Sequence, residues 1–205
     1  MAGPPERRSE EGGCMNDGHA GPAIAEPAWV GDVLRFWFDE LSETHWFAKD
    51  PDLDAWIRDR FLDLHECLLA QTGADASTPR AALAAVIVLD QFSRNMFRGD
   101  PRAYATDPIA CRIAKAAIAS GFDARLSTPQ RMFLYLPLEH SEAIGDQELA
   151  LRLIETLGNA EWTRYAIAHK TIIERFGRFP HRNAILGRPS TLAEVALLKD
   201  PMGSF

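Results

Sequence analysis

The chain has 205 residues and is 46% hydrophobic, which suits one domain with a substantial buried core. Its formal net charge is −7, and an acidic protein repels a phosphate backbone, so nucleic acid is not an expected partner. The three cysteines are far apart and lack zinc or redox spacing, which argues against a disulfide framework and a structural zinc site.

The first residues, 1–26, are rich in Gly, Pro, Glu and Arg and lack an apolar stretch. We therefore expect a disordered tail rather than a signal peptide, followed by a single helical domain over residues 27–205. The longest apolar run, Ala81–Leu89, is far shorter than the ~20 residues that a membrane span needs. These features predict a soluble, cytoplasmic protein with no membrane partner.

Along the rest of the chain, apolar residues recur at helical spacing. The runs that predict helices are 30–41, 53–68, 79–97, 109–118, 132–138, 149–157, 162–176 and a short last helix from the capping box at 191–194. The run 79–97 is apolar nearly all round in its first half, which is typical of a central buried helix. Pro137 should kink or end its helix, because proline removes a hydrogen bond and crowds the preceding turn.

Helix boundaries are marked by proline and glycine. Asp or Thr followed by Pro suits an N-cap and the first helical position, because the N–H that proline lacks would be unpaired there. These pairs begin at Asp50, Thr78, Asp100, Asp107 and Thr128. Glycines stand where helices should stop, at positions 73, 99, 121, 158 and 177.

The fold class predicted from these signals is all-α. No segment shows sustained strand alternation, and short connections favour antiparallel packing of neighbouring helices. We expect helical hairpins packed as a bundle or as a short tetratricopeptide-like solenoid, although no repeat of fixed period can be found.

The first polar stretch, 90–98, directly follows the buried apolar run. Asp90, Arg94 and Arg98 are four residues apart and should share one helix face. Polar groups that continue a buried helix should be paired or should face a cavity. Two interpretations stay open: an internal ion-pair network that locks the helices together, or a ligand-binding site.

The second stretch, 139–147, follows Pro137. Glu139 and Glu142 flank His140, and a histidine beside carboxylates suits acid–base chemistry. The alternative is a solvated helix end with Asp146 capping the next helix.

The third stretch, 175–183, is basic and carries interleaved aromatic residues in an acidic protein. Arginine forks bind carboxylate or phosphate, so Arg178 and Arg182, with Asn183, could hold an anionic group, and His181 could move a proton. Alternatively, the arginines neutralise internal acids or lie in a solvated loop. His169, on an apolar helix face, is expected to be a hydrogen-bonded core residue.

Several common catalytic signatures are missing. The sequence has no Gly-rich phosphate loop, nucleophile elbow or paired zinc-ligand motif, and no histidine follows a glutamate by three residues as di-iron bundles require. We therefore predict no metal site and can name no cofactor, and the sequence alone does not decide whether the chain is an enzyme.

These stretches together resemble a bacterial family catalogued as domain of unknown function 924. The resemblance is carried by FWF at 36–38, WF at 46–47, LDQFSRN at 89–95, FRG at 97–99, YLPLEHSE at 135–142, HKTIIERFGRFPHRN at 169–183, LGR at 186–188 and ST at 190–191. It covers about residues 30–198 and implies a helical, tetratricopeptide-like fold without implying any catalytic residue. Ser93 stands where the family usually has proline, so the resemblance does not fix a helix break there.

Two functions remain open. In the first, the three stretches converge on a pocket for a small anionic ligand, with His140, Glu142 and His181 as the candidate catalytic residues. The candidate ligand-binding residues are Asp90, Arg94, Arg98, Glu139, Arg178, Arg182 and Asn183. In the second, a tetratricopeptide-like groove binds a peptide or protein partner without catalysis.

Overall fold

The computed structural model describes residues 26–71 and 76–199. Within these ranges every regular element is a helix, which confirms the all-α class. The expected tail lies outside the described residues except for Glu26, whose carboxylate pairs with Arg80 at 3.1 Å. Gly73 also lies outside them. Among the described residues, no helix combines the length and apolar content needed to cross a membrane.

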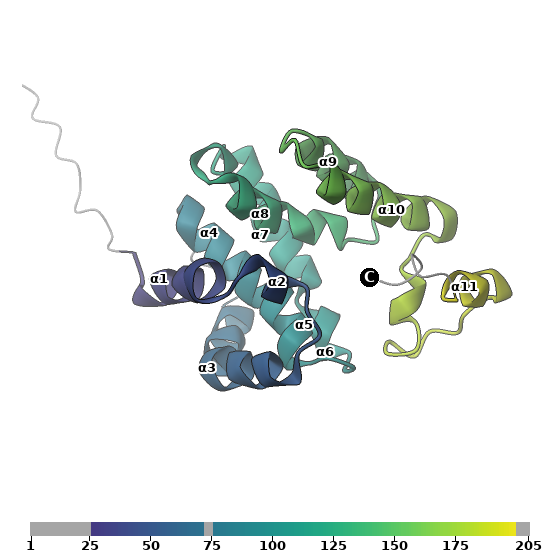
Figure 1. Cartoon of the computed structure of the whole chain (residues 1–205), viewed down its shortest axis with the longest axis horizontal. Helices are drawn as coiled ribbons and strands as arrows, with labels where there is room; N and C mark the ends of the chain where they lie inside the picture. The colour runs from purple at the N-terminus through teal and green to yellow at the C-terminus, as the bar shows by residue number, and fades with distance from the viewer. Residues whose placement is uncertain (1–25, 72–75, 200–205) are drawn as a thin grey trace, which may run out of the picture.

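The N-terminal half begins with α1 and ends with the short helices that follow the central helix (Figure 1). Its elements are α1 (Ala28–Arg35), the π-helical η1 (Phe36–Glu40), α2 (Glu43–Trp46), α3 (Pro51–Ala70), α4 (Pro79–Val86), the π-helical η2 (Ile87–Phe92), α5 (Ser93–Met96) and α6 (Arg102–Ala105).

In the C-terminal half, consecutive long helices pack on one another: α7 on α8, α8 on α9 and α9 on α10 (Figure 1). Beyond α10 the chain turns away, and α11 lies at the opposite end of the molecule from α1. The elements are α7 (Asp107–Ala119), η3 (Asp123–Arg125), α8 (Thr128–Glu139), α9 (Ile144–Glu155), α10 (Ala160–Phe176), η4 (Pro180–Arg182) and α11 (Leu192–Leu197). The finer expectation of tetratricopeptide-like packing stays a prediction.

The centre of the fold is α4 with η2, as the apolar run indicates. Every residue from Ala81 to Phe92 is buried, and α4 contacts α1, α7 and α8. Aromatic rings pack against the end of this segment: Phe92 lies 4.8 Å from Phe61 and 5.5 Å from Trp37, measured between ring centroids.

The predicted helix 79–97 is continuous but changes type, because a π-helical stretch separates α4 from α5. At this stretch the carbonyl of Leu89 accepts hydrogen bonds from the hydroxyls of Ser93 (2.8 Å) and Thr106 (2.5 Å). Side-chain donors of this kind satisfy backbone groups where the regular helical ladder is interrupted. Asp90 therefore lies in a widened turn rather than in a regular α-helix.

Pro137 lies inside α8, and the helix ends two residues later at Glu139. Pro137 cannot donate a backbone hydrogen bond to the carbonyl four residues earlier, but helical bonding continues past it as far as the N–H of His140, so the proline does not itself end α8. The end of α8 places polar side chains next to its buried face: Glu139 is buried, and residues 140–142 are half-buried.

Replacing Gly177 with alanine should lower the free energy of unfolding by about 1–2 kcal/mol. Gly177 ends α10 with a φ of +67°, a conformation in which a Cβ crowds the following carbonyl. Urea unfolding would measure the loss. Gly31→Ala is the matched control, because Gly31 lies inside α1 with open space around it and alanine should stabilise it by roughly 0.5–1 kcal/mol. Equal effects of both variants would contradict this account.

Candidate functional site

Five side chains from separate elements form one connected group, which we call the Asp90 cluster. Asp90 comes from η2, Arg94 from α5, Asp107 from the start of α7, His140 from the residue after α8 and Arg182 from η4. The first and second polar stretches, and part of the third, therefore meet as the sequence predicts. The meeting place is where Arg182, beyond α10, contacts Tyr104 of α6 and Asp107 of α7.

Asp90 is fully buried and has several partners. Both of its carboxylate oxygens lie 2.9 Å from Nδ1 of His140. Gln91 donates to Oδ2 at 2.6 Å, and the guanidinium of Arg94 lies 3.1 Å from Oδ1. Burial opposes ionisation of Asp90, but the charge of Arg94 and the hydrogen bonds from His140 and Gln91 outweigh it and hold the pKa below its ordinary value.

The charge of Asp90 determines the tautomer of His140. An ionised carboxylate can only accept hydrogen bonds, so Nδ1 of His140 must carry a proton and donate it. Burial, followed by the positive charge of Arg94, lowers the pKa of His140, while Asp90 acts in the opposite direction. The neutral ring therefore presents Nε2 as an acceptor. The hydrogen bonds that the described residues make to this ring reach Nδ1, and 15% of the side chain is exposed.

Asp107 connects two arginines. Arg94 binds it through two parallel hydrogen bonds of 2.9 and 3.0 Å, and Arg182 donates to its Oδ2 at 3.1 Å. The other end of Arg182 donates to the backbone oxygen of His140 at 3.0 Å. The ring of Tyr104 packs against both guanidinium groups: its centroid is 4.6 Å from Cζ of Arg182 and 5.6 Å from Cζ of Arg94. Opposite charges thus alternate across the cluster.

A second carboxylate–histidine pair lies beside the first. Glu139 Oε1 is 2.9 Å from Nδ1 of His169, and that nitrogen is also 2.9 Å from the backbone oxygen of Tyr165. The rings of His140 and His169 are 6.2 Å apart. His169 is buried on α10 with hydrogen-bond partners, which confirms the interpretation drawn from its apolar helix face.

His181 lies next to these rings and is held neutral. Burial, and then the positive charge of Arg182, lower the pKa of His181 to about 3. Its ring is 5.6 Å from that of Phe179, which in turn is 5.6 Å from the ring of His169. A neutral imidazole at this place can donate or accept one hydrogen bond without adding charge.

Glu142 anchors the segment that carries His181 and Arg182. It accepts two hydrogen bonds from Arg188, of 2.8 and 3.0 Å, and one from the backbone N–H of Phe179. Arg188 also donates to the side chain of Asn183, whose amide donates to Ser190. In this structure Glu142 and Asn183 bind the segment that carries His181 and Arg182 and so hold it in place.

Two arginines of the predicted site lie elsewhere. Arg98 falls beyond the end of α5, so the four-residue spacing from Arg94 no longer applies, and it binds Asp54 of α3 at 2.7 and 2.8 Å. Arg178 binds Glu194 of α11 at 2.7 and 2.9 Å. The expectation that they converge with Asp90 is therefore wrong for these two residues.

Sequence reasoning missed Asp107, which it interpreted as an N-cap. Asp107 is instead the first residue of α7, and its side chain is directed to the arginines. The hydroxyl of the preceding Thr106 donates to the backbone oxygen of Leu89, so the Thr106 side chain does not cap α7 either. In the sequence, an Asp-Pro pair at a helix start looks the same whether the aspartate caps the helix or binds arginines elsewhere. Tyr104 and Arg188 were also missed, because no local pattern marks their contacts with Arg182 and Glu142.

Unpartnered polar atoms gather around the cluster. Among the described residues, six buried side-chain nitrogen or oxygen atoms have no hydrogen-bond partner. Two belong to the segment itself, Nδ1 of His181 and Nε of Arg182, and two lie beside His140, Oε2 of Glu139 and Oε1 of Gln147. Buried polar atoms are rarely left unpaired, so this concentration marks a place where water or a ligand completes the hydrogen bonding.

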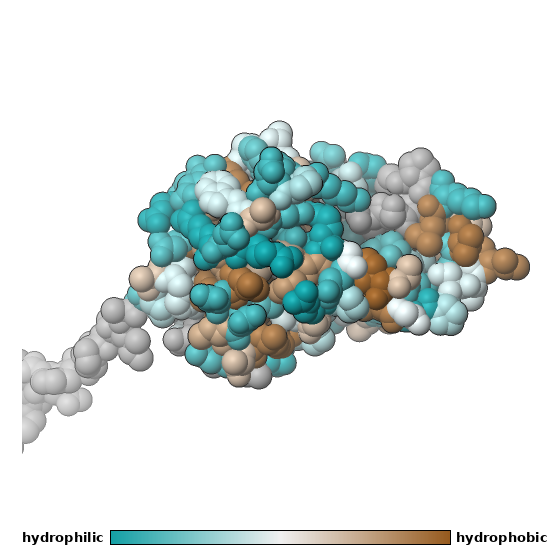
Figure 2. Space-filling model, turned by 90° about the horizontal axis from the view of Figure 1, so that it is seen from below, coloured by the Kyte–Doolittle hydropathy of each residue, from teal (hydrophilic) through white to brown (hydrophobic). Residues whose placement is uncertain are grey.

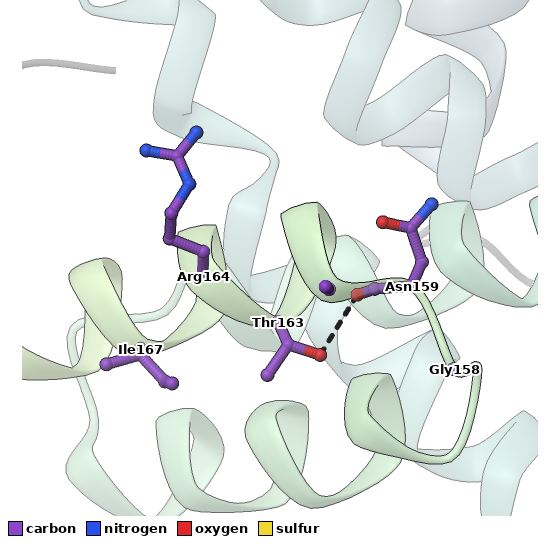
Figure 3. Close-up of a pocket in the computed structure, with 6 residues that line it drawn as sticks. Gly158, Asn159, Thr163, Arg164 and Ile167 are labelled. Atoms are coloured by element: carbon purple, nitrogen blue, oxygen red, sulfur yellow. Dashed lines mark hydrogen bonds between the residues drawn. The ribbon is translucent and has the colours of Figure 1, made fainter.

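Two surface hollows lie away from the cluster. One of about 370 Å³ is lined by residues at the α9–α10 turn and along α10, including Asn159, Thr163 and Ile167 (Figure 3). Another of about 540 Å³ lies between α2 and the start of α8, and includes Trp46 and Gln130. Within the described ranges, no group of three or more His, Cys, Asp or Glu side chains is arranged to hold a metal ion.

Fold and site together define an all-helical protein with a buried, charge-paired cluster built around a carboxylate–histidine pair. Comparison with known families agrees with the resemblance in the sequence. The chain belongs to the DUF924 family, described as bacterial protein of unknown function, whose model matches residues 33–202. The structure is similar to that of a protein of unknown function from Agrobacterium tumefaciens, with 40% identity and a TM-score of 0.79, over 84% of this chain and 97% of that one. A search of curated proteins finds no match.

Proposed function

We propose that the chain binds a small anionic ligand, carrying a carboxylate or phosphate group, at the Asp90 cluster. The observation that carries this proposal is the set of unpartnered buried atoms, above all Nε of Arg182. A buried guanidinium N–H without an acceptor costs free energy, and an anionic oxygen is the strongest acceptor it could have. The neutral ring of His181 supplies a further hydrogen-bonding atom beside it.

Charge around Arg182 supports an anion. Arg182 shares its acidic partner Asp107 with Arg94, and Arg94 also pairs with Asp90. Burial and the nearby charge of Arg94 lower the pKa of Arg182, which means that its surroundings only partly compensate its positive charge. An incoming anion would complete that compensation.

Inorganic phosphate and small mono- and dicarboxylates should raise the melting temperature of the protein. A ligand present at 100 times its dissociation constant adds about 2.7 kcal/mol of stability, which is a shift of about 5–10 °C for a domain of this size. Each variant is compared with its own unliganded melting temperature. Arg182→Met should abolish the shift, whereas Arg178→Met, which changes the same residue type outside the cluster, should retain it.

This proposal fails if none of these probes shifts the melting temperature of the unchanged protein. It fails equally if Arg182→Met responds as strongly as Arg178→Met, because binding would then occur elsewhere.

A second candidate function, the binding of a partner protein or peptide, is favoured by the apolar surface of α11. Leu192 is 91% exposed, and Val195 and Leu198 are exposed on the same helical end. Figure 2 shows apolar residues gathered over α11 at this end of the molecule. Exposed apolar patches of this kind commonly mark interaction sites. Leu192→Glu should then abolish capture of a partner that the unchanged chain retains, while leaving anion binding intact.

A further inference from the structure

The ring of His140 connects the buried interior to the surface. On one side Nδ1 faces both oxygens of Asp90, which is fully buried. The hydrogen bonds that the described residues make to the ring all reach Nδ1, which leaves Nε2 on the partly exposed side. Asp90 itself is fixed by Gln91 and Arg94 and lies in the π-helical turn, so the direction of the ring is set by the central helix of the fold.

We propose that His140 is a general base whose Nε2 takes a proton from the anionic ligand, and that Asp90 is the positioning residue that holds the ring in the tautomer this requires. The proposal rests on the proposed function, because it assigns chemistry to the ligand bound at the Asp90 cluster. A buried carboxylate that fixes the tautomer and orientation of an imidazole is a general arrangement for proton transfer.

The step is a proton transfer. A weakly acidic O–H or C–H bond of the ligand breaks, its electron pair stays on the ligand, and a new N–H bond forms at Nε2. The imidazolium that results faces the negative charge of Asp90, while Arg182 is the cation available to the negative charge that grows on the ligand. The substrate class is therefore a small carboxylate or phosphate compound with such a proton, and no oxidant or reductant is needed.

Titratable and charged groups from five elements surround His140. Asp90 on η2 and Asp107 on α7 raise the basicity of the ring, whereas Arg94 on α5 lowers it. From the C-terminal segment, Arg182 contacts its backbone oxygen, and His181 is close enough that the two imidazoles influence each other. From α10, His169 lies with its ring 6.2 Å away. The ring thus stays neutral, and able to accept a proton, near neutral pH.

His45 offers a matched control in the same chain. Its Nδ1 accepts a hydrogen bond from the backbone N–H of Ser42 at 3.2 Å and lies 2.7 Å from the Ser42 hydroxyl, which can also donate to it, so we expect its neutral ring to carry the proton on Nε2. We therefore expect opposite tautomers for His45 and His140, and one NMR spectrum shows the protonation of the ring nitrogens of both residues.

Long-range proton–nitrogen NMR spectra of the uniformly ¹⁵N-labelled, unliganded protein test the proposal between about pH 5 and pH 8. His140→Gln identifies the resonances of the ring by their loss. The expected result is a protonated Nδ1 and an unprotonated Nε2 for His140, and the reverse for His45. In Asp90→Asn the pKa of His140 should fall further, because the partner of the imidazolium is gone.

A proton on Nε2 of His140 in the unchanged chain would overturn the proposal, and so would a His140 titration that is the same in Asp90→Asn. The tautomer is read without any substitution at Asp90, so the test stands even if Asp90→Asn does not fold. The NMR sample contains no ligand, so its result does not depend on ligand binding. If phosphate and carboxylates failed to bind, the proposed function would be refuted, but the tautomer of His140 would be unaffected. The wrong tautomer would refute the base while leaving anion binding by Arg182 untouched.

Discussion

Replacing Asp90 with alanine should lower the free energy of unfolding by about 3–5 kcal/mol, measured by urea unfolding near neutral pH. Removing one member of a buried charge pair is expensive because the remaining charge stays desolvated. Here the loss falls on Arg94, which keeps Asp107 as its carboxylate partner, and on Nδ1–H of His140, which loses the carboxylate that accepts its proton. The amide of Gln91 loses a partner as well.

Asp32→Ala is the control for this prediction. Asp32 pairs with Arg35 at 2.5 Å on the surface of α1, where the two side chains are 51% and 57% exposed. Exposed pairs contribute about 0–1 kcal/mol, because water and salt screen them. A loss at Asp90 no larger than the loss at Asp32 would mean that the Asp90 cluster contributes little to stability.

The contribution of Asp90 should also depend on pH in a fixed direction. Its pKa in the folded protein is lowered relative to the unfolded chain, in which an aspartate titrates near about 3.9. The stabilisation is therefore complete above about pH 4 and is lost as the pH falls from there towards the folded-state pKa. In the His140→Gln background, where no imidazole titrates beside Asp90, the loss of unfolding free energy caused by Asp90→Ala should be smaller at about pH 3 than at neutral pH.

Phe92→Ala should cost a similar amount, about 3–5 kcal/mol, because it leaves a cavity where a fully buried ring stood. Phe92 ends the π-helical segment and lies within 5.8 Å of Phe36, 5.5 Å of Trp37 and 4.8 Å of Phe61, measured between ring centroids. These aromatic neighbours fix the turn that carries Asp90. We therefore expect the substitution to loosen the site as well as to destabilise the core.

Phe47→Ala provides the comparison, since Phe47 is 62% exposed and stacks only on Phe133. Surface substitutions usually change stability by less than about 0.5 kcal/mol, and one ring contact adds about a further 1 kcal/mol. Urea unfolding of both variants gives the difference. Similar losses for the two phenylalanines would show that the aromatic packing around η2 is not what holds the turn.

Helix positions were predictable because their signals are local. Asp50 and Thr78 cap α3 and α4 through their side chains, and the capping box at Thr191 starts α11. Gly177 ends α10 in the left-handed conformation that few other residues adopt. The type of helix was not predictable: η2 depends on hydroxyl donors that include Thr106, which is distant in sequence from the carbonyl it satisfies.

The candidate site was predicted in part. Spacing alone pairs Asp90 with Arg94, and the run after Pro137 provides His140. Arg98 and Arg178 show the limit of that reasoning, because each binds an acid from another helix. Asp107 shows the opposite error: a residue with an ordinary capping role in the sequence becomes the bridge between two arginines.

The sequence by itself determined that this protein is helical, that the helix after Pro79 is central, and that three polar stretches depart from ordinary surface composition. These properties depend on periodicity, capping and composition, which neighbouring residues establish together. Only the tertiary structure decided which acid neutralises which arginine, because a charged side chain pairs with whichever partner packing brings within reach. It also decided that Asp90 faces Nδ1 of His140, and hence which nitrogen of that ring is left to accept a proton.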